Sequence, residues 1–68
     1  MGSQKLLGHN IKKAREKAKK TQEELAQVAG IHVSYLSRIE RGVVNPSIEV
    51  LESIAKSLKI KSSEILPF

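Results

Sequence analysis

The chain has 68 residues, with twelve Lys and Arg against seven Asp and Glu, which gives a formal net charge of +5 at pH 7. We expect a single domain over residues 1–68, because a chain of this length builds one small core and has no room for a sensor domain. Cysteine is absent, which excludes disulfides, thiolate metal sites and a cysteine nucleophile, and fits a reducing cytoplasm. The apolar runs are too short for a membrane span, and the first residues lack the apolar part of a signal peptide.

The excess of basic residues gives an indication of the kind of partner that the protein binds. A pI near 9.8 favours a polyanion, but the same charge also serves solubility, so composition alone leaves both interpretations open. The sequence shows no nucleophile, paired-carboxylate cleft, glycine-rich phosphate loop or metal constellation. We therefore expect a binding protein that is not an enzyme and takes no cofactor, metal or evident small-molecule ligand.

A first helix is predicted from Leu6 to Lys19. Its apolar residues recur at helical spacing, and most of its lysines point outward. The apolar positions are Leu7, Ile11, Ala14 and Ala18. Arg15 interrupts the apolar side and needs an acidic partner, because an unpaired buried ion costs several kcal/mol.

Two further helices are predicted on either side of a turn too short to be a free linker. Thr21 and Glu24 have the spacing of a capping box, so the second helix begins at Gln22 and ends before Gly30. Its inward residues are Leu25, Ala26, Val28 and Ala29. In the third helix Leu36 and Ile39 point inward. Glu40 falls beside them, and we expect it to pair with Arg15; two separately solvated charges are the alternative.

The opposite side of the third helix is small and polar and ends in cations. This stripe consists of Val33, Ser34, Ser37, Arg38 and Arg41. A helix about 10–12 Å across fits the major groove of B-DNA, which is roughly 12 Å wide. The stripe therefore favours contact with duplex DNA.

The residues of this pair of helices resemble a known motif. Counted from Gln22, the fifth, ninth, fifteenth and eighteenth of twenty positions are Ala26, Gly30, Leu36 and Ile39. With the segments QEELA, YLSRIERG and NPSIEVLESIAKSL, the chain resembles the Cro/repressor-type helix-turn-helix family of bacterial and phage regulators, which includes restriction-modification controller proteins. The resemblance covers roughly Leu7 to Leu66. It implies an all-α, compact five-helix fold like that of lambda repressor, with the motif (residues 22–41) at helices 2 and 3. It also implies a recognition helix that begins at Val33 and an ion pair between Arg15 and Glu40. Members of this family bind paired half-sites as dimers, so the same is expected here.

Candidate base contacts lie at the start of the recognition helix and along its outer side: His32, Val33, Ser34, Ser37 and Arg38. Arg38 is the favoured specificity determinant, because a bidentate contact to guanine is worth about 1–3 kcal/mol of discrimination; a phosphate contact or surface ion pair is the alternative. Val33 either packs on a thymine methyl or stays exposed without a partner. His32 has three candidate roles, as a helix cap, a phosphate contact or a base contact.

Candidate phosphate contacts are Gln22, Tyr35, Arg41, Asn45 and Lys20. The resemblance assigns this role to Gln22 and Tyr35, and the N–H groups at the start of the second helix favour a phosphate there. The alternatives are an ordinary first-turn residue for Gln22, packing alone for Tyr35 and a solvated lysine face for Lys20. Similar proteins carry glycine and an apolar residue where this chain has Lys19 and Lys20, so the first helix either runs longer or ends in a strained turn.

The last third of the chain supplies scaffold. Pro46 disfavours helix at Asn45, and Ser47 then caps a fourth helix. Its inward residues are Ile48, Leu51, Ile54, Ala55 and Leu58. A short fifth helix is predicted at Ser63–Leu66, with Ser62 as its cap and Pro67 at its end. The apolar residues Val50, Ile65, Leu66 and Phe68 form a candidate dimer contact.

Two functions remain open on the sequence. The first is a homodimeric regulator of transcription that binds a specific, pseudo-palindromic site on double-stranded DNA in the bacterial cytoplasm, associated with the nucleoid. The second is an antitoxin-like or other protein-interaction module with the same fold. Salt separates them, since neutralising about six to ten phosphates makes binding steeply salt-dependent and an apolar protein interface responds weakly.

Overall fold

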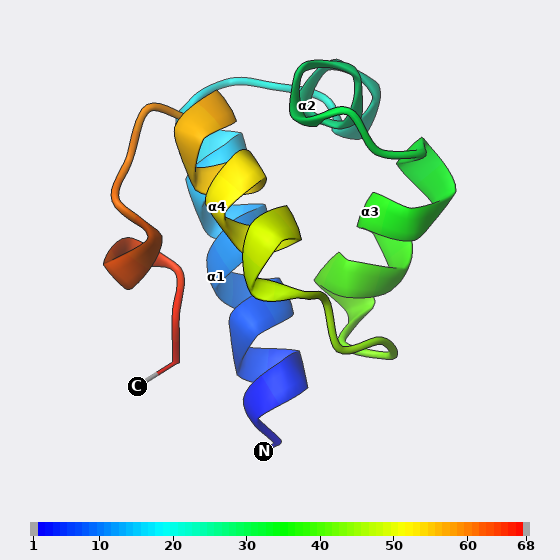
Figure 1. Cartoon of the computed structure of the whole chain (residues 1–68), viewed down its shortest axis with the longest axis vertical. Helices are drawn as coiled ribbons and strands as arrows, with labels where there is room; N and C mark the ends of the chain where they lie inside the picture. Colours follow the sequence, from blue (N-terminus) through cyan, green and yellow to red (C-terminus); the bar gives the residue numbers. More distant parts are fainter. Residues whose placement is uncertain (1, 68) are drawn as a thin grey trace.

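The computed structural model describes residues 2–67, and every regular element in that range is helical. Its elements are α1 (Ser3–Lys17), α2 (Gln22–Ala29), α3 (Val33–Arg41), α4 (Ile48–Ser57) and the 3-10 turn η1 (Ser62–Glu64). In Figure 1, α4 lies in front of α1, α2 crosses near the end of both, and α3 and η1 lie on opposite sides of them. Helix α3 packs against α1 and α2, and α2 also packs against α4. The prediction of an all-α helix-turn-helix fold is confirmed.

The prediction of a fifth α-helix is wrong, because this segment forms a 3-10 turn. Residues 62–64 form a single 3-10 turn, in which Glu64 N–H donates to Lys61 O and Ile65 N–H to Ser62 O. Pro67 has no N–H and disfavours helical geometry in the residue before it, so the turn cannot extend into an α-helix. The chain therefore has four α-helices over its described residues.

The ends of α2 follow the sequence signals. Thr21 Oγ1 accepts from Glu24 N–H at 3.0 Å, and Glu24 Oε1 accepts from Thr21 N–H at 2.8 Å, which completes the predicted capping box. Gly30 follows with φ of 75°, a conformation that glycine adopts without steric cost. Ile31 N–H then donates to Ala26 O at 3.0 Å and turns the chain toward α3.

Helix α1 begins three residues earlier than predicted and ends at Lys17 in a strained turn. Lys19 has φ of 58°, and the N–H groups of Lys19 and Lys20 donate to Glu16 O and Arg15 O. These are the hydrogen bonds of a Schellman motif, in which glycine usually occupies the left-handed position. A residue with a Cβ there costs roughly 1–2 kcal/mol. Lys59 repeats this geometry after α4, also with φ of 58°.

The core lies where the four helices meet and is closed by the segment after η1. Its fully buried larger side chains are Ile11, Leu25, Leu36, Ile39, Ile54 and Ile65. Three residues predicted to point inward do not: Val28 is 68% exposed, Ile48 is 60% exposed, and Ala18 is exposed. The buried face of α2 consists of Leu25, Ala26 and Ala29, and Val28 falls outside it. Ile48 is the first residue of α4, whose buried face begins at Leu51.

Candidate nucleic-acid interface

Helix α3 separates its residues sharply between the core and the outside. Leu36 and Ile39 are almost completely buried, and Glu40 is buried beside them. The opposite side faces outward, and Figure 1 shows no other helix beyond it. Because the buried face fixes how the helix is rotated, the outer stripe has one defined orientation.

The structure brings the predicted base contacts together on this outer side. His32, Val33, Ser34 and Arg38 are exposed, and Ser37 is half-buried. Val33 keeps 41% of its surface exposed although it is apolar. His32 occupies the N-cap position of α3 but makes no capping hydrogen bond through its side chain, so the capping alternative does not hold. The stripe presents short side chains at the start of α3 and arginines toward its end.

The predicted phosphate contacts fall into two groups. Lys20, Arg41 and Asn45 are exposed, and they lie near the start of α2, at the end of α3 and in the following loop. Tyr35 is half-buried and packs against the core, so its ring has a structural role. Gln22 is also half-buried, and its Nε2 donates to Glu40 Oε1 at 2.9 Å.

An ion pair joins α1 to the inner side of α3, as the sequence predicted. Arg15 Nε lies 2.8 Å from Glu40 Oε2, and Nη2 lies 3.1 Å from Oε1. The side chains are only 11% and 3% exposed, so the alternative of two separately solvated charges is wrong. The hydrogen bond to Glu40 raises the pKa of Arg15 above its ordinary value, against the lowering effect of burial. The pair is bidentate, which is the strong geometry for a guanidinium and a carboxylate.

Arg15 also fixes the loop that leads into α2. Its Nη1 donates to Lys20 O at 2.8 Å, directly before the capping Thr21. Together with the Gln22 amide, this places α1, the start of α2 and the inner side of α3 around one carboxylate. The hydrogen bond from Gln22 to Glu40 was not predicted from the sequence. The one available signal was that Gln22 directly follows the capping threonine and so lies next to this loop.

The close approach of α1 to α3 depends on a glycine, Gly8, whose role was not predicted from the sequence. A Cβ at Gly8 would lie 2.6 Å from Glu40 O and would also clash with Ile39 O. Only glycine allows the backbone of α1 to come this close to the end of α3. Gly8 interrupts the apolar residues at Leu7 and Ile11, which is a signal that the sequence offered.

A second missed contact ties the turn of the motif to α4. Ser53 Oγ donates to Ala29 O at 2.7 Å, and Ala29 is the last residue of α2. A carbonyl at the end of a helix has no partner within the helix, so this bond satisfies it. The helix pair of α2 and α3 is therefore braced from α1 on one side and from α4 on the other.

The predicted dimer contact requires a correction. Ile65 is 0% exposed and lies in the core of its own chain, and Asn10 Nδ2 donates to Ile65 O at 3.1 Å. It is therefore not available to a second copy. Val50 and Leu66 are half-buried and pack partly against the core, and Phe68 lies outside the described residues.

The described part of the chain shows neither a metal site nor a membrane-spanning helix. No group of three or more His, Cys, Asp or Glu side chains within residues 2–67 is placed to hold a metal ion. None of the helices in that range is long and apolar enough to cross a membrane.

Comparison with known proteins matches this chain to helix-turn-helix proteins, both by sequence and by structure. The family described as helix-turn-helix matches residues 11–65. The chain is 43% identical over 60 residues to the immunity repressor protein of Bacillus phage phi105, which covers 88% of this chain and 42% of that protein. The chain thus spans less than half the length of this relative.

Two solved structures extend the comparison. The restriction-modification controller protein C.AhdI from Aeromonas hydrophila has a TM-score of 0.89 and 29% identity, over 91% of this chain and 94% of that chain. SinR, a master regulator for biofilm formation whose structure was solved in complex with DNA, has a TM-score of 0.80 and 40% identity, over 84% of this chain and 92% of that chain. The protein therefore belongs to the helix-turn-helix family, as its resemblance to Cro/repressor-type regulators predicted.

Proposed function

We propose that this protein regulates transcription by binding a specific sequence of double-stranded DNA, with α3 in the major groove. The observation that carries the proposal is the outer stripe of α3, which is exposed and polar on a helix held rigidly from behind. A helix about 10–12 Å across fits a groove roughly 12 Å wide. The relative SinR, solved in complex with DNA, supports this proposal.

In this proposal the contacts divide by position along the helix. The residues nearest its start approach base edges, as is usual for recognition helices, and Arg38 reads a guanine through a bidentate contact. The base contacts are His32, Val33, Ser34, Ser37 and Arg38. These side chains set which sequence is bound.

The phosphate contacts surround these residues and set the register on the duplex. Arg41, Asn45 and Lys20 are exposed and supply them directly. Gln22 keeps one N–H of its amide for a phosphate, since the other is held by Glu40. Tyr35 supplies its hydroxyl while its ring packs on the core.

The protein acts as a homodimer on paired half-sites in the bacterial cytoplasm. The proposed contact centres on Leu66, and the exposed Ile48 extends it. Val50 lies two residues from Ile48, and therefore on another side of α4, so it does not belong to the same contact. Ile48 and Leu66 line one groove of about 350 Å³, together with Leu7 and Leu51. Apolar side chains that remain exposed around a groove of this kind are typical of interaction sites.

Selection from a random duplex library tests the function. We expect one enriched half-site sequence at a fixed spacing. Its affinity should fall by roughly 10³–10⁵ between about 50 and 200 mM salt if six to ten phosphates are neutralised. A library that yields no enriched sequence, with binding that ignores salt, would contradict the proposal and favour a protein-interaction module.

The dimer contact has a separate test. Ile48→Glu replaces an exposed side chain, so the fold should persist and the dimer should dissociate. Binding to the selected duplex should then show two independent half-sites, and the preference for paired over single half-sites should disappear. An unchanged preference would remove this surface from the proposal without affecting the role of α3.

A further inference from the structure

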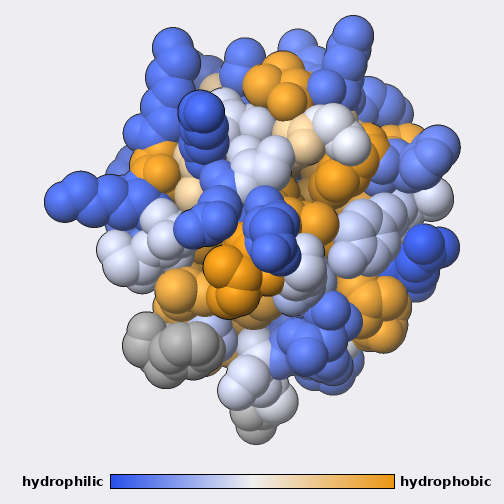
Figure 2. Space-filling model, in the orientation of Figure 1, coloured by the Kyte–Doolittle hydropathy of each residue, from blue (hydrophilic) through white to orange (hydrophobic). Residues whose placement is uncertain are grey.

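An open groove of about 570 Å³ lies beside α1, on the side where η1 packs. Its apolar surface comes from Ala14, Ala18, Leu58 and Ile60, and its basic wall from Lys13 and Lys17. Figure 2 shows apolar surface between hydrophilic side chains over the segment that joins α4 to η1. The groove therefore combines an apolar surface with a charged rim.

This groove faces away from the proposed DNA contact. Gly8 and Arg15 lie on the side of α1 that contacts α3. With about 3.6 residues per turn, Lys13 and Lys17 fall on the opposite side of α1 from them. Figure 1 agrees, since α3 and η1 lie on opposite sides of α1 and α4. A partner in the groove and a duplex at α3 can therefore be bound together.

The charges of the groove are unbalanced. Lys13 and Lys17 are exposed and one turn apart, and within residues 2–67 the one ion pair is Arg15 with Glu40. The acidic residue in the wall is Glu64, whose carboxylate accepts from Lys61 N–H at 2.8 Å. Lys59 and Lys61 flank Ile60 along the chain and are exposed, although they do not line the groove themselves. The two lysines outnumber the one carboxylate in the lining, and among residues 2–67 neither Lys13 nor Lys17 has an acidic partner.

The apolar surface decides between classes of ligand. A phosphate backbone needs only cations, and it gains nothing from Ala18, Leu58 or Ile60. An aliphatic side chain placed there gains about 25 cal/mol for each Å² of apolar surface that it removes from water. We infer that this groove binds a short acidic segment of a partner protein that carries an aliphatic side chain. The aliphatic group packs on the groove, and the carboxylates pair with Lys13 and Lys17.

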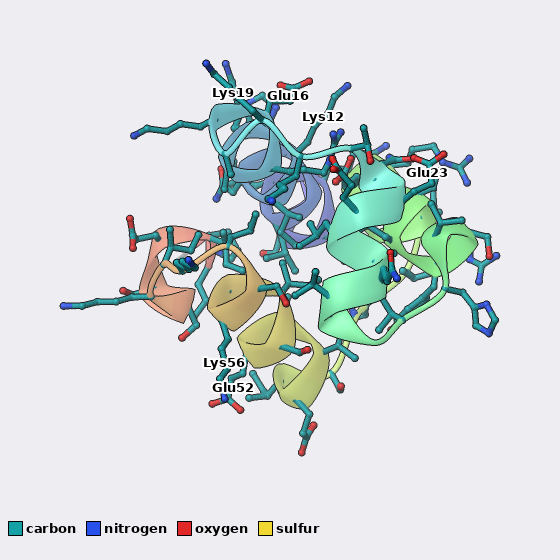
Figure 3. The ribbon with its side chains drawn as sticks, turned by 90° about the horizontal axis from the view of Figure 1, so that it is seen from above. Lys12, Glu16, Lys19, Glu23, Glu52 and Lys56 are labelled. Carbon is teal, nitrogen blue, oxygen red and sulfur yellow. The ribbon has the colours of Figure 1, made fainter. Side chains whose placement is uncertain are left out.

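Other lysines supply a matched control. Figure 3 shows Lys12 beside Glu16 on the outer side of α1, and Lys56 beside Glu52 on the outer side of α4. None of these four residues lines the groove. Replacing Lys12 and Lys56 by Glu changes the net charge by the same amount as replacing Lys13 and Lys17, but at different places.

The test is an NMR titration of the isotope-labelled protein with a capped peptide of sequence Glu-Leu-Glu-Glu-Leu-Glu. We expect saturable shifts at the amides of Ala14, Ala18 and Ile60. The double variant Lys13→Glu, Lys17→Glu should bind about threefold more weakly or worse, because each exposed pair is worth about 0.2–1 kcal/mol. Ala18→Glu should also weaken binding, and the Lys12→Glu, Lys56→Glu control should bind within twofold of the unmodified protein.

Three outcomes would overturn the inference. A peptide with Ser in place of Leu that binds equally well would show that charge alone acts. An equal loss of peptide affinity in both double variants would show that the peptide responds to the overall positive charge of the protein and not to a specific site. Duplex DNA that shifts the same amides in the Arg38→Ala, Arg41→Ala protein would make this side a second nucleic-acid contact. None of these outcomes depends on what α3 binds, so failure here leaves the proposed function intact.

Discussion

Arg15 holds both oxygens of the Glu40 carboxylate, with Nε 2.8 Å from Oε2 and Nη2 3.1 Å from Oε1. The same guanidinium binds Lys20 O, and the Gln22 amide binds Glu40 from the start of α2. Glu40 belongs to the inner side of α3, whose outer side is the proposed DNA contact. The orientation of that outer side therefore depends on a polar cluster behind it.

Glu40→Ala should destabilise the protein by about 3 kcal/mol, because it leaves the Arg15 guanidinium largely buried without its anion. Urea denaturation, followed by circular dichroism, measures the change. A domain of this size has only about 3–10 kcal/mol of stability, so the variant is partly unfolded at room temperature if the unmodified protein lies at the low end of this range.

A paired replacement keeps this prediction testable if the single variant unfolds. Arg15→Met with Glu40→Leu removes both charges and fills the space with apolar side chains, a change that is often neutral or stabilising for a buried pair. The double variant should recover most of the stability that Glu40→Ala loses. A melting temperature unchanged by Glu40→Ala would show that the pair contributes nothing.

The ion pair shows what the sequence was able to predict. Arg15 and Glu40 are each a charged residue among inward-facing apolar positions. Because their charges are opposite, the sequence predicts that they form an ion pair. Gln22 broke no pattern, because a glutamine in the first turn of a helix is ordinary. The burial of Ile65 was equally hidden, since a short apolar segment near Pro67 carries no periodicity that separates the core from a free surface.

Lys19→Gly should stabilise the protein by about 0.5–1 kcal/mol. Lysine costs roughly 1–2 kcal/mol in the left-handed conformation after α1, and glycine avoids most of this cost but loses more backbone entropy on folding. Thermal unfolding should show a rise of about 4 °C or more per kcal/mol for a domain of this size.

The matched control is Lys12→Gly, which places glycine in the interior of α1. It should lower stability by about 1 kcal/mol, because glycine is a poor helix former. If Lys19→Gly also lowered the melting temperature, the strained turn after α1 would be refuted. The sequence offered two outcomes for this corner, and only the backbone geometry at Lys19 distinguishes them.

The capping box of α2 should make stability depend on pH. The Thr21 N–H donates to the Glu24 carboxylate, and this bond lowers the pKa of Glu24 below its ordinary value of 4.5. The ionised group therefore stabilises the folded state above pH 4.5, and this contribution is lost as the pH falls through the folded pKa. Glu24→Gln should be less stable than the unmodified protein at neutral pH, and the two should converge in acid.

Denaturant midpoints measured over a series of pH values check this difference. Glu24→Ala serves as the control, because neither variant has a titrating group at this position. The stability difference between Glu24→Ala and Glu24→Gln should therefore be the same at every pH. Parallel pH profiles for the unmodified protein and Glu24→Gln would mean that the carboxylate contributes no more than a neutral cap.

Replacing the two arginines of α3 should change DNA binding in different ways. Arg38 and Arg41 are both exposed, have the same chemistry and lie three residues apart. In our proposal Arg38 reads a guanine, so Arg38→Ala should cost about 1–3 kcal/mol of discrimination at one base pair of each half-site. Arg41 contacts a phosphate, so Arg41→Ala should weaken all sequences alike and reduce the slope of log affinity against log salt by about 0.9 per half-site.

Affinities for the selected duplex and its single-base variants, each measured over a range of salt, separate these roles. Since both substitutions remove one positive charge, net charge cannot explain a difference between them. A uniform loss for both variants would place Arg38 on the backbone, and base preference would then depend on Val33, Ser34 and Ser37 alone. A base-specific loss in Arg41→Ala would instead mean that α3 lies deeper along the groove than we propose, with its last turn at the bases.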